Sequence, residues 1–226
     1  MGARKLLSLV SGVNKVPDVK CSRDRFFELL RKNGLLVKKK RRPYPKTTKS
    51  FGWFRKYEDQ FNGRSFNKPH RAWVSDITFI RVADRFRYLF LTTDAYSRKI
   101  IGWELANNME SQWAVKTLQM AMKQCPSMKG VIHHSDRGFQ YCCKAFSALM
   151  ESREGVMSMG KVGYCYDNAM AERVNGILKT EYLLDSTFRN ADQAYKATAQ
   201  AIKSYNEQRP HWSLGLKIPA DVHTEA

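Results

Sequence analysis

Hydrophobic and polar positions alternate over short runs between residues 73 and 105. The runs Trp73–Val82, Tyr88–Thr93 and Lys99–Leu105 are rich in β-branched and aromatic residues and are separated by polar breaks. Runs of this kind fit a pleated, half-buried surface and predict β-strands. Because the breaks are too short to hold a crossover helix, we expect three consecutive antiparallel strands.

After these strands, segments with helical apolar spacing alternate with short apolar runs. The helical spacing predicts helices at Ser111–Gln124, Tyr141–Met150, Asp167–Tyr182 and Asp192–Tyr205. The short runs predict buried strands at Gly130–His134 and Val156–Met159. The order β-β-β-α-β-α-β-α-α predicts an α/β fold, with a mixed five-stranded sheet and helices on both of its faces.

The first third of the chain has a different pattern and is predicted to be separate from this core. Residues 1–42 are basic and helical in pattern, with a helix at Arg23–Asn33 for which Ser22 is the expected N-cap. Residues 43–72 are basic and irregular, so we predict a linker there. The core is then expected to cover residues 73–222, including the C-terminal helices.

Most of the positive charge lies in this first third. The chain carries a formal net charge of +18, and residues 1–72 hold 20 Lys and Arg against 5 Asp and Glu, a net charge of +15. Such a segment is drawn to a polyanion by Coulomb attraction and counterion release. A solvated, solubilising arm is the alternative. The basic run that we expect to cross DNA phosphates consists of Lys38, Lys39, Lys40, Arg41 and Arg42.

Composition argues against membrane and secreted proteins. The chain contains no run of 18 or more apolar residues, and its basic stretch lacks the broad apolar face of a membrane-surface helix. Its start lacks the features of a signal peptide. Five cysteines without a CxxC pair are typical of reduced thiols. We therefore expect a cytoplasmic protein with a nucleic-acid partner and no membrane contact.

Three acidic residues stand out by their positions. Asp76 lies within the first strand, Asp136 follows the fourth strand, and Glu172 lies in the first turns of a helix. Taken singly, each is more typical of a surface charge or a helix cap than of a metal ligand. If the fourth strand neighbours the first, however, the three acids converge. Carboxylate oxygens that hold two hard divalent cations can activate water and stabilise the leaving oxygen when a phosphodiester is cut.

The helix that carries Glu172 has one polar face. Asn168, Glu172, Asn175 and Lys179 lie on this face at helical spacing, opposite an apolar stripe. The arrangement predicts Glu172 on metal and Lys179 on phosphate, with Asn168 and Asn175 as further DNA contacts. A helix N-cap is the alternative role of Asn168.

The residues around Asp136 allow other interpretations. Arg137 and Gln140 follow it in a loop-to-helix turn and are predicted to contact the DNA end, with local capping and packing equally possible. Tyr141 is not expected to be a covalent nucleophile, because no recognisable order of Arg and His surrounds it. A zinc site is disfavoured because adjacent strand residues point to opposite faces. Its ligands would be His133, His134, Cys142 and Cys143.

Five segments form a specific combination: WVSDITFI (73–80), YLFLTTDAYSRKIIGW (88–103), HHSDRGFQY (133–141), MSMGKVGYCYDNAMAERVNGILKTE (157–181) and YNEQRPHWSLGLKIPA (205–220). They resemble the DDE insertion-sequence transposases, whose catalytic core is similar to retroviral integrase. Within that family the chain resembles the downstream-frame OrfB protein of two-frame insertion elements. Asp136 and Glu172 are separated by 35 residues, which matches the family's D-35-E spacing.

The resemblance implies a ribonuclease-H-like fold in which Asp76, Asp136 and Glu172 form the catalytic triad and hold two Mg²⁺ or Mn²⁺ ions. It implies metal-dependent cleavage at the element end and transfer of the freed 3′-hydroxyl to target DNA. The implied partners are double-stranded DNA, further copies of the chain and an upstream-frame helix-turn-helix protein at the bacterial nucleoid.

Family proteins have a longer helical stretch before the core. Residues 1–42 are therefore expected to be a truncated helix-turn-helix-like module. Two alternatives stay open for the function. One is a catalytically silent DNA-binding regulator from a truncated element copy, and the other is a plain nuclease without strand transfer.

Overall fold

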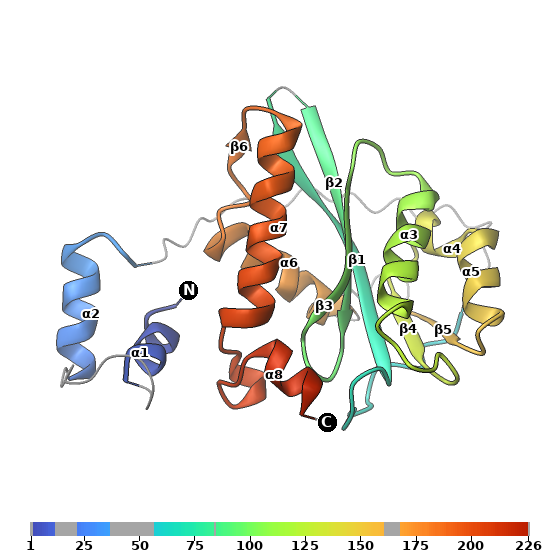
Figure 1. Ribbon diagram of the computed structural model, residues 1–226, viewed down its shortest axis with the longest axis horizontal. Helices are drawn as coiled ribbons and strands as arrows, with labels where there is room; N and C mark the ends of the chain where they lie inside the picture. The colour runs from blue at the N-terminus through green and yellow to red at the C-terminus, as the bar shows by residue number, and fades with distance from the viewer. Residues whose placement is uncertain (1, 12–21, 37–56, 84, 161–167, 226) are drawn as a thin grey trace.

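A mixed sheet lies at the centre of the computed structural model, which describes residues 2–11, 22–36, 57–83, 85–160 and 168–225 (Figure 1). The strand order is β3-β2-β1-β4-β5, and β6 also pairs with β1. The pairs β1–β2 and β2–β3 are antiparallel, whereas β1–β4, β4–β5 and β1–β6 are parallel. The strands are β1 (Ala72–Val82), β2 (Arg85–Asp94), β3 (Ile100–Ala106), β4 (Ile132–Ser135), β5 (Val156–Met159) and β6 (Thr187–Phe188).

Helices cover both faces of this sheet (Figure 1). On one face, Trp73 and Phe90 share a hydrophobic core with α3 (Ser111–Met122), α4 (Phe139–Cys142) and α5 (Lys144–Glu151). On the other face, Ile80 and Leu89 share a second core with α6 (Ala169–Glu181) and α7 (Ala191–Gln208). A short 3-10 helix (Trp212–Leu214) and α8 (Pro219–Thr224) follow. No helix in the described ranges is long and apolar enough to cross a membrane.

The five predicted strands and most of the predicted helices are confirmed. The prediction of one continuous helix at Tyr141–Met150 is wrong. The segment Tyr141–Met150 leaves the helical conformation at Cys143 (φ −70°, ψ 148°), which separates α4 from α5. Helical apolar spacing continues across the break because Tyr141 and Phe146 pack into the same core. The predicted five-stranded sheet gains a sixth strand, β6, whose two residues are too few for a periodic signal.

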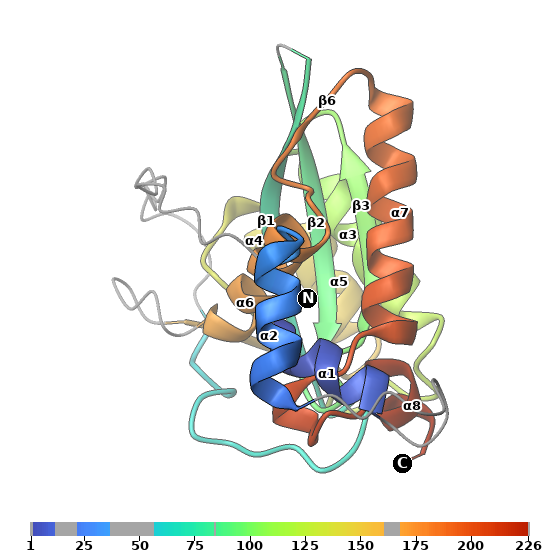
Figure 2. The same cartoon turned by 90° about the vertical axis from the view of Figure 1, so that its left-hand side faces the viewer.

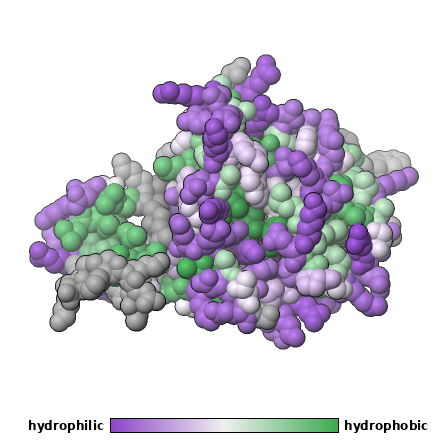
Figure 3. Space-filling view, in the orientation of Figure 1, coloured by the Kyte–Doolittle hydropathy of each residue, from purple (hydrophilic) through white to green (hydrophobic). Residues whose placement is uncertain are grey.

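Two basic helices precede the core. They are α1 (Ala3–Ser11) and α2 (Arg23–Lys32), and the Ser22 hydroxyl caps α2 as predicted by accepting a hydrogen bond from the Arg25 amide at 3.4 Å. Figure 3 shows hydrophobic residues gathered over this helix pair. The predicted DNA-binding run from Lys38 to Arg42 lies outside the described residues.

Part of the predicted linker packs on the core. The Gln60 amide donates a hydrogen bond to the Ser158 hydroxyl at 2.8 Å, and the Phe61 ring stacks on His134 with 4.8 Å between centroids. These contacts fix the chain just before β1. Residues 43–56 of the same predicted linker lie outside the described residues.

A bidentate ion pair joins the ends of the two long helices. The Arg209 guanidinium, which is fully buried, donates to the Glu181 carboxylate through Nε at 2.8 Å and Nη2 at 3.0 Å. Lys5 of α1 is buried nearby, and burial together with the charge of Arg209 lowers the pKa of Lys5 to about 8. The pair holds the C-terminal end of α6 against the end of α7, and so helps to fix α6 on the sheet.

Close contact between β3 and α3 gives a test of this packing. A Cβ atom added at Gly102 would collide with the backbone carbonyl oxygen of Thr117, whereas one added at Gly176 on α6 meets no atom within 4 Å. We expect Gly102→Ala to lower the free energy of unfolding by about 1–3 kcal/mol. Gly176→Ala is the matched control and is expected to leave it unchanged or raise it by up to about 1 kcal/mol. Urea unfolding of both variants measures the difference, and equal effects would contradict this packing.

Candidate active site

The parallel pairing of β1 with β4 brings two carboxylates to one edge of the sheet. Val74 lies opposite His134 and Ser75 opposite Ser135 in this ladder. Asp76 and Asp136 are the next residues on each side, so they are neighbours at the point where β4 ends. The adjacency that the sequence interpretation assumed for the first and fourth strands is therefore present.

Asp76 is held by two hydrogen bonds and is electrostatically strained. Its Oδ1 accepts from the Ile77 amide at 2.9 Å, and its Oδ2 accepts from Asn175 Nδ2 at 2.7 Å. Burial, with repulsion from Asp136 and Glu172, nevertheless raises the pKa of Asp76 to about 7. Both other acids are therefore close enough to act on Asp76 through their charge.

Asp136 begins a tight turn in which Gly138, without a side chain, leaves room for the carboxylate. Its Oδ1 accepts a hydrogen bond from the Gly138 amide at 3.0 Å, and a Cβ atom at Gly138 would lie 2.9 Å from the same oxygen. Burial raises the pKa of Asp136, while the Gly138 hydrogen bond and the neighbouring His134 act in the opposite direction. The turn thus wraps the chain around one carboxylate oxygen.

Helix α6 carries the third acid and two asparagines that fix the helix to β1. Asn168 Nδ2 donates to the Ser75 carbonyl at 3.0 Å, and Asn175 donates to Asp76 as described above. Glu172 lies in the first turn of α6 and is exposed. A carboxylate at this position is favoured by the positive end of the helix dipole.

The predicted DNA contacts in this region divide into buried and surface groups. Gln140, Asn168 and Asn175 are buried, and Gln140 donates to the Met109 carbonyl at 2.9 Å. Their amides are therefore hydrogen-bonded inside the protein, which the interpretation as DNA contacts did not anticipate. Arg137 is half-buried and donates to the Gly160 carbonyl at 2.8 Å, and the ammonium of Lys179 lies 5.9 Å from the Phe79 ring centroid.

The two histidines before Asp136 do not form a metal site together. His133 Nε2 is 2.8 Å from the Ser75 hydroxyl, and its ring packs on Phe146. His134 Nδ1 is 2.8 Å from the Ser158 hydroxyl, and its ring stacks on Phe61. The two rings belong to different layers, as the alternation of a strand requires.

Three buried oxygens around the acids were not foreseen. The Tyr141 hydroxyl, Asn168 Oδ1 and Asn175 Oδ1 are buried without a hydrogen-bond partner in the described part of the chain. Burial together with the charges of Asp136 and Asp76 raises the pKa of Tyr141 far above its ordinary value, so this phenol stays protonated. In the sequence, these three residues are recognisable only as polar residues at positions that would equally suit packing in the interior.

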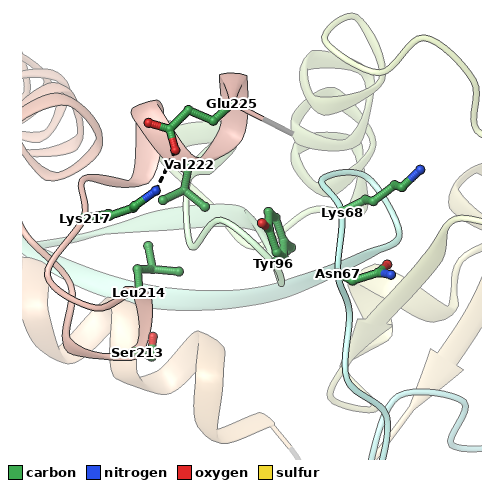
Figure 4. Close-up of a pocket in the computed structure, with 8 residues that line it drawn as sticks. All are labelled: Asn67, Lys68, Tyr96, Ser213, Leu214, Lys217, Val222 and Glu225. Carbon is green, nitrogen blue, oxygen red and sulfur yellow. Dashed lines mark hydrogen bonds and ion pairs between the residues drawn. The ribbon is translucent and has the colours of Figure 1, made fainter.

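The geometry is incomplete as a metal centre. No group of three or more His, Cys, Asp or Glu side chains in the described ranges lies together in a way that would hold a metal ion. Asp76 and Asp136 are adjacent at the end of the β1–β4 pair, and the exposed Glu172 acts on Asp76 through its charge. A cavity of about 460 Å³ beside α8 is lined by other residues, among them Tyr96 and the ion pair of Lys217 with Glu225 at 2.8 Å (Figure 4).

Family models and relatives match the part of the chain that contains the three acids. Two family models, each described as an integrase core domain, match residues 67–165 and 156–219. The chain is 34% identical over 160 residues to a protein of insertion sequence element IS986/IS6110 from Mycobacterium tuberculosis (strain CDC 1551 / Oshkosh), covering 68% of this chain and 58% of the relative. It is 35% identical over 150 residues to transposase InsF for insertion sequence IS3A from Escherichia coli (strain K12), covering 66% and 52%. The chain therefore spans just over half the length of these relatives.

Solved structures share the fold. The catalytic core domain of HTLV-2 integrase in complex with magnesium superposes with a TM-score of 0.53 at 18% identity, covering 69% of this chain and 97% of that one. A chain of the simian T-cell lymphotropic virus intasome in complex with PP2A regulatory subunit B56 gamma gives 0.61 at 18% identity, covering 99% and 71%. The mixed sheet with helices on both faces is therefore the ribonuclease-H-like fold of retroviral integrase cores.

The repulsion between the acids predicts an unusual dependence of stability on pH. The folded protein holds a proton on Asp76 up to a pKa of about 7, whereas the unfolded chain releases it near 3.8. Since the folded state binds more protons between these values, this group makes stability fall as pH rises from about 4 to 7. Asp136→Asn removes a repelling charge and is expected to raise the melting temperature in EDTA at pH 8 by about 2–4 °C for each kcal/mol gained.

The gain in melting temperature should be smaller at pH 5, because Asp76 is already protonated there. Thermal melts of the variant and the unsubstituted protein across this pH range measure it. Asp192→Asn, at an exposed position on α7 paired with Lys196, is the control and should give no such gain. A pH-independent gain, or none, would contradict the electrostatic account.

Proposed function

Because the chain belongs to the integrase core domain family, we propose that it is the catalytic part of an insertion-sequence transposase that cuts and joins DNA strands. Asp76, Asp136 and Glu172 are its proposed catalytic acids. The observation that carries the proposal is the adjacency of Asp76 and Asp136 across the β1–β4 pair, with Glu172 near enough to repel Asp76. Similarity to named insertion-sequence transposases supports the same reaction.

The residues present fit divalent cations. Two half-buried carboxylates and an exposed third at a helix start form an all-oxygen donor set, which suits Mg²⁺ or Mn²⁺. Burial and the charge of Asp136 raise the pKa of Asp76, and no Lys or Arg among the described residues counteracts this rise. The partnerless Asn175 Oδ1 next to Asp76 adds a further buried acceptor. When two ions are bound, they supply an activated water and stabilise the leaving oxygen.

The chain's own residues hold and orient these groups. Asn175 fixes the Asp76 carboxylate through Oδ2, and the Gly138 amide fixes Asp136 through Oδ1. The other oxygen of Asp76, Oδ1, accepts a hydrogen bond from the Ile77 amide. Asn168 donates to the Ser75 carbonyl and so ties the start of α6, the helix that carries Glu172, to β1.

In the proposed reaction, water first cleaves a phosphodiester at the element end and leaves a 3′-hydroxyl. That hydroxyl then attacks a phosphodiester of target DNA, and the displaced 3′-oxygen leaves as a new hydroxyl. No covalent bond to the protein forms, which agrees with Tyr141 being buried with a raised pKa. Double-stranded DNA, further copies of this chain and an upstream-frame partner protein are part of the proposal.

Loss of one acid tests the chemistry directly. Asp136→Asn keeps the shape of the side chain but weakens cation binding, so cleavage of a plasmid that carries the element's terminal repeats should fall at least about a hundredfold in Mg²⁺. DNA binding in EDTA should be unchanged. Gel assays for nicked and joined products measure cleavage, with Asp192→Asn as the matched control. Full cleavage by Asp136→Asn would contradict the assignment of Asp136 as a catalytic acid.

Metal binding can be measured through protein stability, without an assay of DNA cleavage. Mg²⁺ or Mn²⁺ should raise the melting temperature of the protein, because a ligand that binds only the folded state stabilises it. The rise should be larger at pH 8 than at pH 6, since protonation of Asp76 competes with the cation. Asp76→Asn and Asp136→Asn should abolish the rise, and Asp192→Asn should keep it. A rise of equal size in all variants would place the cation elsewhere.

A further inference from the structure

An aromatic and basic surface on the β1–β2 hairpin is used neither by the core nor by the acids. We call Phe79, Arg81, Phe86 and Tyr88 the hairpin surface. Phe79 pairs with Tyr88 and Arg81 with Phe86 across the two strands, so all four side chains share one face. Phe79 and Phe86 remain 38% and 49% exposed. Two such rings side by side on a strand pair are unusual for a surface without a partner.

The helices of this face do not reach the surface. The core shared with α3, α4 and α5 includes Ile77 and Tyr88 but stops before Phe79, Arg81 and Phe86. Figure 2 shows the end of the hairpin projecting beyond the end of β3. Phe79 and Phe86 therefore remain partly open to solvent in the described part of the chain.

The rings are ordered by one another and by cations. Phe79 packs edge to face on Phe86, with 6.0 Å between centroids, and on Tyr88, with 5.8 Å. Arg81 lies over the Phe86 ring at 5.3 Å, and Lys179 lies over the Phe79 ring at 5.9 Å. Each exposed ring is thus paired with a positive charge at cation–π distance.

One side chain links the hairpin surface to the helix of the candidate active site. Phe79 follows Asp76 by three residues, on the order of 10 Å along the strand at about 3.3 Å per residue, so the two side chains point to opposite faces of β1. Lys179 lies on the same helix as Glu172 and Asn175 and reaches Phe79. Lys179 therefore joins the hairpin surface to the helix that carries Glu172.

We propose that the hairpin surface binds unpaired nucleotides of the DNA substrate, with bases stacked on Phe86 and Phe79 and phosphates on Arg81. This inference rests on the proposed function. Cations beside every exposed ring are complementary to a polyanion and would repel an identical basic surface on a second copy of the chain. Flat rings stack on bases only where those bases are unpaired, so single-stranded DNA is the favoured occupant over duplex.

An oligonucleotide of twelve thymidines and an abasic strand of the same length separate bases from phosphates. Binding is measured in EDTA by fluorescence anisotropy, so that no cleavage takes place. The unsubstituted protein should prefer the thymidine strand, and Phe86→Leu should lose roughly fivefold or more in affinity for it while its affinity for the abasic strand stays unchanged. Phe86→Trp keeps a ring and should retain the preference. Arg81→Gln should weaken binding of both strands.

The matched control is Tyr195→Leu. Tyr195 is also 49% exposed, but it packs against Trp103 in the layer of α7. This variant should bind both strands as the unsubstituted protein does. Circular dichroism and thermal melts establish that each variant is folded, and light scattering gives its molar mass without DNA.

An unchanged preference in Phe86→Leu and Phe79→Leu would overturn the proposal. A loss of preference that appears only together with a lower molar mass would overturn it as well, because the surface would then join two copies of the chain. Either result would leave the proposed function standing, since that depends on Mg²⁺-dependent cleavage and its loss in Asp136→Asn. Failure of cleavage with an intact base preference would instead sink the enzyme assignment alone.

Discussion

Two like-charged carboxyl groups lie side by side at the edge of a sheet, and the rest of the site is arranged around their repulsion. The parallel β1–β4 ladder makes Asp76 and Asp136 neighbours, and burial makes their charge costly, which raises the pKa of each. Helix α6 offsets part of this cost, because Asn175 donates to Asp76 and Asn168 donates to the Ser75 carbonyl just before it. The buried Glu181–Arg209 pair holds the far end of the same helix.

The chain has two ways to lower the electrostatic cost of placing these acids together. Hydrogen bonds to one carboxylate reduce the repulsion, and the raised pKa values allow a proton to do the rest. A cation would take the place of that proton, so affinity for metal and strain in the metal-free protein have the same origin. Functional sites commonly store strain of this kind at the expense of stability.

Hydrophobic periodicity predicted most of the sheet and its covering helices, because strands with one buried face alternate and amphipathic helices repeat. It failed where packing continued across a change in backbone, as at Cys143 between α4 and α5. It gave no information on two-residue β6. Strand adjacency had to be assumed, since β1 and β4 are joined only through long-range pairing. For the site, residue type singled out the three acids, but it could not indicate that the amides of Asn175 and Gln140 are buried, because these residues suit surface and interior positions equally.

The division between acids and hairpin surface follows from what each group can bind. Buried carboxylates repel a phosphate unless cations lie between them, so they cannot also provide affinity for the DNA strand. Arg81, Phe86 and Phe79 have the opposite character, since cations attract the backbone and rings attract bases. Stacking on rings depends little on salt, whereas phosphate contacts weaken steeply with it. A strand held partly by its bases on this surface would therefore stay bound at salt concentrations that loosen the basic N-terminal third, and this separates base stacking from general attraction to DNA.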